Sequence, residues 1–225
     1  VPNDLSKNNN KSFIVSVVSD EKTWMLPWIQ EFLSDLAFQG SQISWVTDPT
    51  KVIEGDFCFI LSCSKIIPIE VLNRNKHNLV VHESGLPKGK GWSPLSWQIL
   101  EGKKSIPVSL FEAEEKVDSG KIYLQDLISL NGDELIHELR EKQGSLTIDL
   151  CRKFIESYPL ILDDAIKQSG EQSFYRKREP SDSMIDVNKT ILEQFNLFRI
   201  VDNERYPAYF DFLGKRFYIR IEKEE

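Results

Sequence analysis

The sequence predicts an α/β protein built around a mainly parallel sheet. Short apolar runs rich in β-branched residues alternate along the chain with segments of helical periodicity, which is typical of a parallel sheet with helices on both faces. Strands are expected at residues 12–18, 43–46, 57–62 and 77–82. The 225 residues suffice for one such domain with a modest extension.

Four helical segments are expected between and after these strands, at residues 23–38, 67–72, 93–100 and 132–158. Thr23 is a suitable cap for the first helix, and Gly40 ends it. Ser93 and Pro94 form a favourable start for the third, with serine as the cap and proline at the first helical position. Gly144 is a possible break within the last and longest helix.

The chain changes character at Gly170. Residues 171–186 carry scattered charges without a clear period, and we interpret them as an extended connector. The remaining elements are expected as a strand at 105–111, a strand at 122–128, a helix at 189–195 and a strand at 217–221. The sequence therefore divides into a core at residues 12–165 and a short C-terminal α+β extension at residues 166–225.

The composition disfavours several classes of protein. A hydrophobic content of 40% and a charged content of 28% are ordinary for a soluble globular protein, and the net charge of −7 disfavours nucleic acid as the main partner. No Cys/His spacing suits a zinc site, so no metal is expected. No apolar run approaches the ~20 residues of a membrane-spanning helix, and the polar N-terminus resembles neither a signal peptide nor an anchor. We expect a cytoplasmic protein without a membrane partner.

Residues 80–97, VVHESGLPKGKGWSPLSW, combine three features of a ligand site. His82 stands at the end of a predicted strand, and open α/β sheets bind ligands beyond the carboxyl ends of their strands. A loop with three glycines follows, whose backbone N–H groups can approach a ligand closely. Lys88 and Lys90 lie in this loop, before a helix N-terminus, where they suit a negatively charged ligand. The alternative is an ordinary strand–loop–helix joint with a partly buried histidine.

Two spaced motifs resemble the signature of the folate-dependent formyltransferases. The first is His82-Glu83-Ser84 with Leu86-Pro87, Gly91 and Pro94, and the second is Val117-Asp118-Ser119-Gly120-Lys121-Ile122. The family reads roughly N-x-H-x-S-L-L-P, then a loop marked by glycine and proline, and later D-x-G-x-I. It includes methionyl-tRNA, glycinamide ribonucleotide and nucleotide-sugar formyltransferases. The resemblance implies a Rossmann-like formyltransferase core and 10-formyltetrahydrofolate as the formyl donor.

The resemblance also implies roles for His82 and Asp118. In the family, a histidine supports the oxyanion that forms when an amine attacks the formyl carbon. An asparagine polarises the formyl oxygen, and an aspartate orients the histidine and relays a proton. We therefore expect His82 and Asp118 to lie side by side at the carboxyl edge of the sheet. The alternative for Asp118 is a turn residue, because Asp-Ser-Gly is favourable turn chemistry in any protein.

The chain departs from the family at the asparagine. Val80 stands two residues before His82, where the family has its asparagine. Asn78 shares a strand face with His82 by parity, but four residues of strand separate the two by roughly 13 Å. A bulge or an early strand end would be needed to make Asn78 the catalytic asparagine. Otherwise another group or a backbone N–H takes this role.

The resemblance further implies cofactor and substrate residues. The family's folate pocket is formed by the loop after the third strand and the loop before the aspartate. The matching residues here are Ser64, Lys65, Ile66, Ile67, Glu115 and Val117. The candidate substrate-binding residues are Ser84, Lys88, Lys90, Trp92, Arg205 and Tyr206. Arg205 and Tyr206 suit a diphosphate and a stacked base, although a tail that closes the core or forms a homodimer interface is the alternative.

The expected substrate is an amino sugar linked to UDP or dTDP. The chain is acidic and shorter than the tRNA-acting members, and its tail is too small for their nucleic-acid-binding domain. Glycinamide ribonucleotide enzymes lack an extension like residues 174–225. Two alternatives stay open: a methionyl-tRNA formyltransferase-like enzyme acting on another amine, and a non-catalytic module that binds a nucleotide sugar. The turn after the first strand lacks G-x-G-x-x-G, so a dinucleotide cofactor is not expected.

Overall fold

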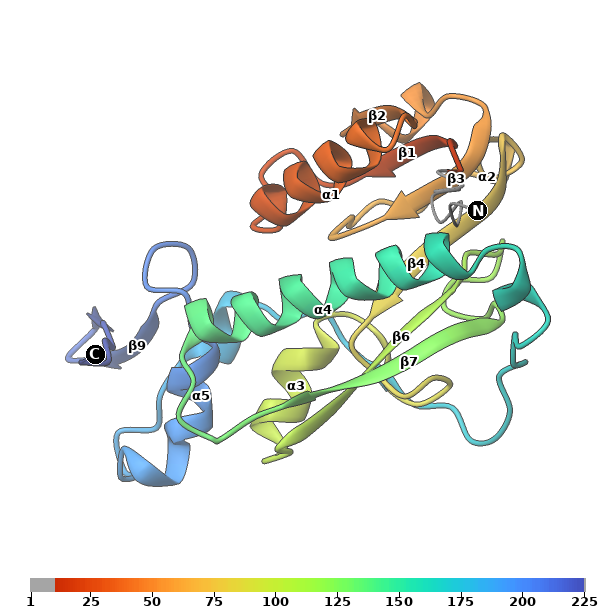
Figure 1. Ribbon diagram of the computed structural model, residues 1–225. Coiled ribbons are helices and arrows are strands. Elements are labelled where there is room, and N and C mark those ends of the chain that lie inside the picture. Colours follow the sequence, from red (N-terminus) through yellow and green to blue (C-terminus); the bar gives the residue numbers. More distant parts are fainter. Residues whose placement is uncertain (1–10, 225) are drawn as a thin grey trace, which may run out of the picture. The chain divides into compact units, whose positions relative to one another are not determined.

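The computed structural model describes residues 11–224, which fall into two compact units (Figure 1). Unit 1 comprises residues 11–80 and 111–120, and unit 2 comprises residues 81–110 and 121–224. The strands of the main sheet follow the hydrogen-bonded order β2 (Gln42–Val46), β1 (Ile14–Val18), β3 (Gly55–Ile60), β4 (Asn75–His82), β6 (Ser105–Glu112) and β7 (Ile122–Ser129). β1 pairs in parallel with β2 and β3, and β3 pairs in parallel with β4, as the alternation of strands and helices predicted.

Unit 1 contains most of the strands that pair in parallel. Its elements are β1 Ile14–Val18, α1 Leu26–Phe38, β2 Gln42–Val46, a 3₁₀ helix at Pro49–Lys51, β3 Gly55–Ile60 and α2 Ile69–Leu72. Two strands contribute residues to both units, namely β4 Asn75–His82 and β6 Ser105–Glu112. All four strands expected before the glycine-rich loop are therefore present, with ends that differ by at most two residues.

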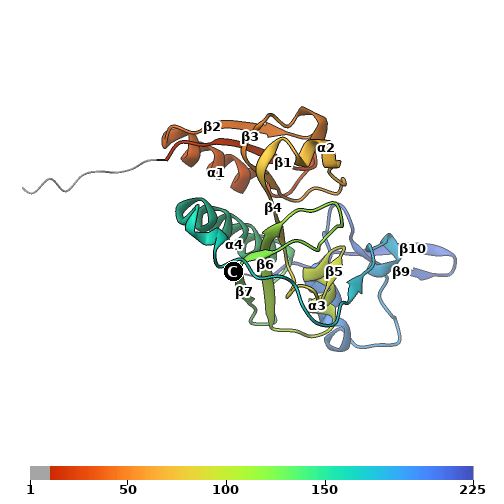
Figure 2. The ribbon, with the colours of Figure 1, turned by 90° about the vertical axis from the view of Figure 1, so that its right-hand side faces the viewer.

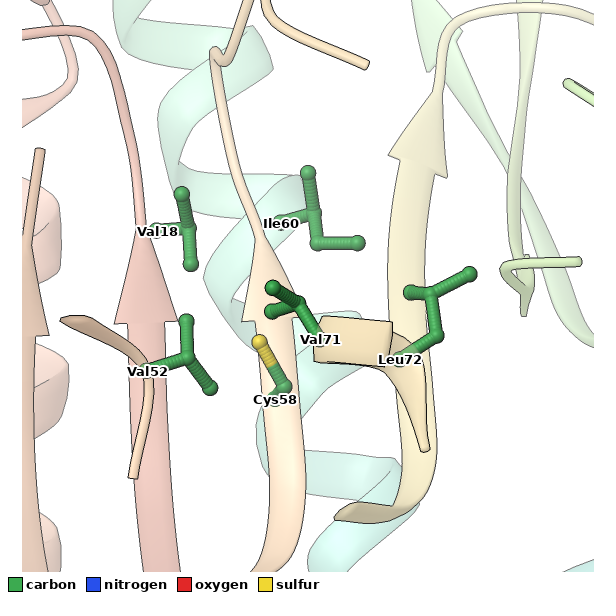
Figure 3. Packing of buried hydrophobic residues seen from close by; sticks show 6 residues of the cluster. All are labelled: Val18, Val52, Cys58, Ile60, Val71 and Leu72. Atoms are coloured by element: carbon green, nitrogen blue, oxygen red, sulfur yellow. The ribbon is translucent and has the colours of Figure 1, made fainter. Parts of the chain in front are cut away.

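Alternate side chains of β3 face two different helices, because successive strand residues point to opposite faces. Phe59 meets Phe32 of α1 edge-on, with ring centroids 5.3 Å apart. Cys58 and Ile60 instead belong to a buried group that we call the α2 cluster (Figure 3). Its members are Val18, Val52, Cys58, Ile60, Val71 and Leu72. Helices thus cover both faces of the sheet in unit 1, as expected.

Helix α1 begins later than the sequence suggested. Thr23 does not cap it, because the helix starts at Leu26 and the Thr23 hydroxyl accepts a hydrogen bond from the Met25 N–H at 3.1 Å instead. Proline is tolerated in a first helical turn, and Pro27 occupies that turn here. The helix ends at Phe38 as predicted, and Gly40 follows in the left-handed region with a φ of +91°.

Unit 2 contains the remaining elements. They are β5 Lys90–Gly91, α3 Pro94–Leu100, β7 Ile122–Ser129, α4 Ile136–Ser157, β8 Phe174–Tyr175, α5 Phe195–Ile200, β9 Ala208–Phe212 and β10 Lys215–Ile219, with 3₁₀ helices at Leu160–Leu162, Pro180–Ser183 and Leu192–Gln194. Helix α4 packs on β7, where the rings of Phe154 and Tyr123 lie 5.1 Å apart. The break expected at Gly144 is absent, because this glycine is buried and the helix runs through it.

The C-terminal segments also correct two expectations. The helix expected at residues 189–195 forms at Phe195–Ile200 instead, because Phe198 is buried there with Val201 and Ala208 in a separate cluster. The strand expected at 217–221 is β10, which pairs antiparallel with β9 in a hairpin (Figure 2). The connector is more ordered than predicted, since it contains β8 and a 3₁₀ helix. The predicted boundary between residues 165 and 166 stays a prediction.

Across residues 11–224, none of the helices combines the length and the apolar character that crossing a membrane requires. Over the same range, no group of three or more histidine, cysteine, aspartate or glutamate side chains is placed to hold a metal ion.

Candidate functional site

His82 is the last residue of β4 and is held by the glycine-rich loop that follows it. Its side chain is buried, with 8% of the residue exposed, and its Nε2 lies 2.9 Å from the carbonyl oxygen of Gly89. A carbonyl oxygen only accepts hydrogen bonds, so Nε2 must carry a proton. Within unit 2, no described residue forms a hydrogen bond with Nδ1. A neutral His82 therefore presents the lone pair of Nδ1.

The backbone N–H groups of the glycine-rich loop are occupied by the connector. The Gly89 N–H donates to the Ser173 hydroxyl oxygen at 2.8 Å, and the Lys90 N–H donates to the Ser173 carbonyl at 2.9 Å. The Trp92 N–H donates to the Tyr175 carbonyl at 3.1 Å. This arrangement is the parallel pairing of β5 with β8. The expectation that this loop offers these groups to a ligand is therefore wrong for these three residues.

Two glycines of this loop leave the space that the connector occupies. Gly91 has a φ of +94°, and a Cβ built there would overlap the carbonyl oxygen of Tyr175. Gly89 has a φ of +73°, and its Cβ would lie 2.9 Å from the Cβ of Ser84. Side chains are therefore excluded at both positions by the chain itself.

The predicted substrate residues of this loop differ in their exposure. Lys88 is exposed, and Trp92 is 41% exposed with the Lys177 ammonium 4.8 Å from its ring centroid. Lys90 is only 2% exposed, and its Nζ lies 3.4 Å from the side-chain oxygen of Gln172. Ser84 is also buried, and its hydroxyl has no hydrogen-bond partner among the described residues. Of these four side chains, Lys88 and Trp92 are therefore the two open to solvent.

Helix α3 starts next to this loop, at Pro94 as predicted. Ser93 does not act as the predicted cap, because it takes a left-handed conformation with a φ of 49° and its side chain makes no capping hydrogen bond. The helix therefore starts without its predicted side-chain cap.

Arg205 and Tyr206, the other predicted substrate residues, stand in a turn held by Asp202. The Arg205 N–H donates to the Asp202 carboxylate at 3.0 Å, and the Tyr206 N–H donates to the Asp202 carbonyl at 2.9 Å. Burial of Asp202 opposes ionisation, but the N–H groups of Arg205 and Glu204 and the guanidinium of Arg140 outweigh it and lower its pKa. Both predicted side chains are exposed on this turn.

Val80, at the position of the family asparagine, takes part in packing. It is half-buried against the α2 cluster of unit 1. Asn78 is buried, and its side-chain NH₂ donates to the carbonyl of Leu72 at 2.8 Å. Its side-chain oxygen has no hydrogen-bond partner among the described residues. The side chain of Asn78 is thus anchored to the last residue of α2, and its catalytic role stays a prediction.

Asp118 lies in a turn of unit 1 that the sequence motif shapes. Asp118 has a φ of 54°, and the Ser119 hydroxyl donates to the Lys116 carbonyl at 2.5 Å. A Cβ at Gly120 would overlap the carbonyl oxygen of Glu112, so only glycine fits against the end of β6. His82 and Asp118 belong to different units, and their predicted closeness stays a prediction.

The first predicted folate loop is held by side chains. The Asp20 carboxylate accepts hydrogen bonds from both the N–H and the hydroxyl of Ser64, each at 3.1 Å. Lys65 donates from its Nζ to the Thr47 carbonyl at 2.8 Å. Ile66 points outward with 76% exposure. The loop therefore keeps an apolar side chain in solvent.

The two predicted folate loops flank the same hydrophobic group of unit 1. Ile67 of the first loop and Ala113 of the second both pack against the α2 cluster. In the second loop, Glu115 is exposed and Val117 is 54% exposed. The structure thus places these two loops within one unit, as their assignment to one pocket requires.

Glu112 is a residue that the sequence did not single out. One carboxylate oxygen accepts the Asn78 N–H at 2.6 Å, and the other accepts from Nδ1 of His77 at 3.0 Å. The sequence signal that could have identified Glu112 was its acidic side chain at the end of a strand otherwise expected to be apolar. Ser173 and Tyr175 were also missed, because nothing near them in sequence resembles a site motif.

A family model described as formyl transferase matches residues 2–146 of this chain, which is more than half of its length. The chain therefore belongs to the formyl transferase family, and the resemblance drawn from the two motifs is confirmed.

Known proteins of this family resemble the chain in sequence and in fold. Methionyl-tRNA formyltransferase of Thermodesulfovibrio yellowstonii is 29% identical over 164 residues, which cover 72% of this chain and 53% of that protein. The chain spans about half the length of the curated relatives it matches. A solved methionyl-tRNA formyltransferase from Clostridium thermocellum has a TM-score of 0.80 at 20% identity, covering 94% of both chains. A 4-N formyltransferase from Francisella tularensis has a TM-score of 0.70 at 20% identity, covering 95% and 98%. These likenesses confirm the Rossmann-like α/β fold.

Proposed function

We propose that this protein transfers a formyl group from 10-formyltetrahydrofolate to a primary amine. The observation that carries the proposal is His82, which occupies the histidine position of the family motif and is fixed at the end of β4 by the Gly89 carbonyl. Membership of the formyl transferase family supports the same reaction.

The two loops of unit 1 fit a folate. Exposed Ile66 and Val117 offer apolar surface to a flat ring. Bound 10-formyltetrahydrofolate would supply the formyl carbon. Ser64, Lys65, Ile67 and Glu115 complete the set that we propose to hold it.

We propose that His82 and Asp118 handle the charge and the proton of the reaction. His82 would use Nδ1, because Nε2 is bound to Gly89. Protonated, it stabilises negative charge on the formyl oxygen, and such a donor contributes ~3 kcal/mol to the transition state. Neutral, it accepts the proton that the amine loses, and a positioned base contributes about two to four decades of rate. Asp118 would orient His82 and relay the proton.

As the acceptor we propose an amino sugar linked to UDP or dTDP, formylated in the cytoplasm. Exposed Lys88 and Lys177 suit the diphosphate, and the exposed ring of Trp92, beside Lys177, suits a stacked base. The net charge of −7 disfavours the polyanionic tRNA. Methionyl-tRNA is the second candidate, and the methionyl-tRNA formyltransferases among the relatives at about 30% identity favour it.

A mass-spectrometric screen tests both acceptors. The full-length protein is incubated with 10-formyltetrahydrofolate and each of a set of UDP- and dTDP-amino sugars, and the formyl mass increment is sought. We expect an increment on at least one sugar and none on initiator methionyl-tRNA. Formylation of the tRNA alone would overturn the acceptor and retain the chemistry. No transfer to any amine would favour a non-catalytic binding module.

A further inference from the structure

We propose that residues 172–175, which we call the strap, are a positioning element that fixes the tautomer and orientation of His82 through the two peptide groups that flank Gly89. Ser173 contacts both groups, one through its hydroxyl and the other through its carbonyl. The inference deepens the proposed function, because its effect on rate rests on His82 taking part in formyl transfer.

Gly89 connects the strap to the histidine through the two peptide groups that flank it. The N–H of Gly89, in the peptide group before this residue, donates to the Ser173 hydroxyl at 2.8 Å. The Gly89 carbonyl, in the peptide group after it, accepts from Nε2 of His82 at 2.9 Å, and the N–H of that same group, on Lys90, donates to the Ser173 carbonyl at 2.9 Å. The residue is also confined, since a Cβ there would lie 2.9 Å from the Ser84 Cβ and 3.1 Å from Cε2 of Tyr175. A shift of Ser173 therefore changes the position of the oxygen that His82 depends on.

The strap is anchored by backbone and side-chain contacts. Towards the loop, the carbonyls of Ser173 and Tyr175 accept the N–H groups of Lys90 and Trp92. The Tyr175 hydroxyl donates to the Glu101 carboxylate at 2.9 Å. The Tyr175 ring also stacks on Trp97, with centroids 6.4 Å apart and an interplanar angle of 14°. These contacts hold Ser173 in place although the residue itself is exposed.

The contact decides which nitrogen of His82 is free for chemistry. Because the Gly89 carbonyl cannot donate, the neutral imidazole must carry its proton on Nε2 and its lone pair on Nδ1. A hydrogen bond of ordinary net strength biases such an equilibrium by about fivefold. Without the strap, the peptide group between Gly89 and Lys90 can turn, and the other tautomer becomes populated. That tautomer presents an N–H where the reaction needs an acceptor.

Nitrogen-15 NMR of the full-length protein, labelled at histidine, tests the proposal. The spectrum is recorded at alkaline pH, and His82 is assigned by its loss in His82→Gln. We expect the Nε2–H tautomer in the wild type and a mixture in Ser173→Ala. The kcat of formyl transfer should fall about five- to tenfold in Ser173→Ala with little change in KM. Ser173→Thr, which keeps the hydroxyl, should restore both readouts.

Two variants serve as matched controls. Tyr175→Phe removes the bond to Glu101 but keeps every backbone contact with the glycine-rich loop, and Ser34→Ala removes a hydroxyl from the exposed face of α1. Both should keep the wild-type tautomer. If Ser173→Ala proves unstable, Ser173→Cys keeps the volume with a weaker acceptor and should shift the tautomer in the same direction.

The proposal and the proposed function fail in different ways. An Nδ1–H tautomer in the wild type, or an unchanged tautomer in Ser173→Ala, would overturn the positioning role whatever the activity. A tautomer that responds to Ser173 in a protein that formylates no amine would support the positioning role and overturn the proposed function.

Discussion

Two predicted ligand-binding loops, one in each unit, differ in what holds them. In the glycine-rich loop of unit 2, the N–H groups of Gly89, Lys90 and Trp92 are bound by backbone and hydroxyl oxygens of the strap. In unit 1, the loop at residues 63–67 is held by side chains, with Asp20 binding Ser64. The first loop is covered by its own chain, and the second carries exposed apolar surface.

The difference shows what a glycine-rich loop does and does not indicate. Glycine permits a close approach to the backbone, but it does not say whether a ligand or the protein approaches. In this protein, the connector lies against the backbone of these glycines. Gly89 and Gly91 therefore indicate a rigid support for His82. The loop at residues 63–67 has no glycine and is the better candidate for direct ligand contact.

The largest expected effect is on the stability of unit 2, which carries the glycine-rich loop. Glu134 and Arg199 form a buried ion pair in unit 2, with Oε2 and Nη2 2.9 Å apart and both side chains 2% exposed. Arg199→Met leaves the Glu134 charge buried without this partner, and it should lower the free energy of unfolding by about 3–5 kcal/mol. Urea denaturation measures this loss. The exposed pair of Glu204 and Arg220 is the control, since Glu204→Gln should cost about 0.5 kcal/mol or less.

Glu134 also predicts a pH dependence of stability. Burial opposes ionisation of Glu134, but the N–H groups of Asn131 and Gly132 and the ammonium of Lys142 outweigh it and lower its pKa to about 2. Because the folded-state pKa lies below the ordinary value of 4.5, the stabilisation is complete above about pH 4.5 and is lost as the pH falls towards 2. A loss of about 2–3 kcal/mol is expected over that range. Glu134→Gln should flatten this part of the profile, and an unchanged slope would contradict the assignment.

The next effect separates two histidines of one strand. His82→Ala should reduce formyl transfer by about two decades or more, and Asp118→Asn should do the same if the family's relay applies. His77→Gln is the matched control, because His77 lies on β4 but bonds to Glu112 and stacks on Phe57. It should leave kcat within about threefold and act on stability instead. Steady-state kinetics and thermal unfolding of each variant distinguish these outcomes, and an active His82→Ala would remove the basis of the proposed mechanism.

A smaller effect compares two glycines with similar backbones. Gly91 and Gly40 have φ values of +94° and +91°, but only Gly91 faces another segment, the carbonyl of Tyr175. Gly40→Ala should cost about 1–2 kcal/mol for its left-handed backbone alone. Gly91→Ala adds the overlap with the strap and should cost about 2–3 kcal/mol. Equal costs in urea denaturation would mean that the strap does not restrain the loop.

Much of the fold followed from local pattern. The apolar runs of β1 to β4 identified the parallel sheet, because a buried strand must be apolar whatever its partners are. Tertiary packing decided what the pattern missed. Gly144 does not break α4 because the residue is buried, and the tail helix forms at Phe195–Ile200 because Phe198 is buried there. Neither burial is visible in a local window of sequence.

The candidate site was predictable only where a motif marks it. His82 and Asp118 stand in two spaced motifs, and the family that these imply is confirmed. Ser173 contacts Gly89 from far along the chain, and its neighbours resemble an ordinary connector. Glu112 was missed for a related reason. Its two partners, His77 and Asn78, stand far from it in the sequence and become its neighbours only when β4 and the end of β6 come together in the fold.

The smallest expected effect tests the loop of unit 1. Asp20→Asn weakens the two hydrogen bonds to Ser64, and each charge-assisted bond contributes about 1.5–3 kcal/mol when buried but less at this exposed site. The KM for 10-formyltetrahydrofolate should rise about three- to tenfold with kcat nearly unchanged, because a less ordered loop weakens binding before the chemical step. Glu193→Gln is the control, since Glu193 likewise accepts the N–H and hydroxyl of one residue, Thr190, in unit 2. An equal rise in KM for both variants would exclude a specific role of this loop in folate binding.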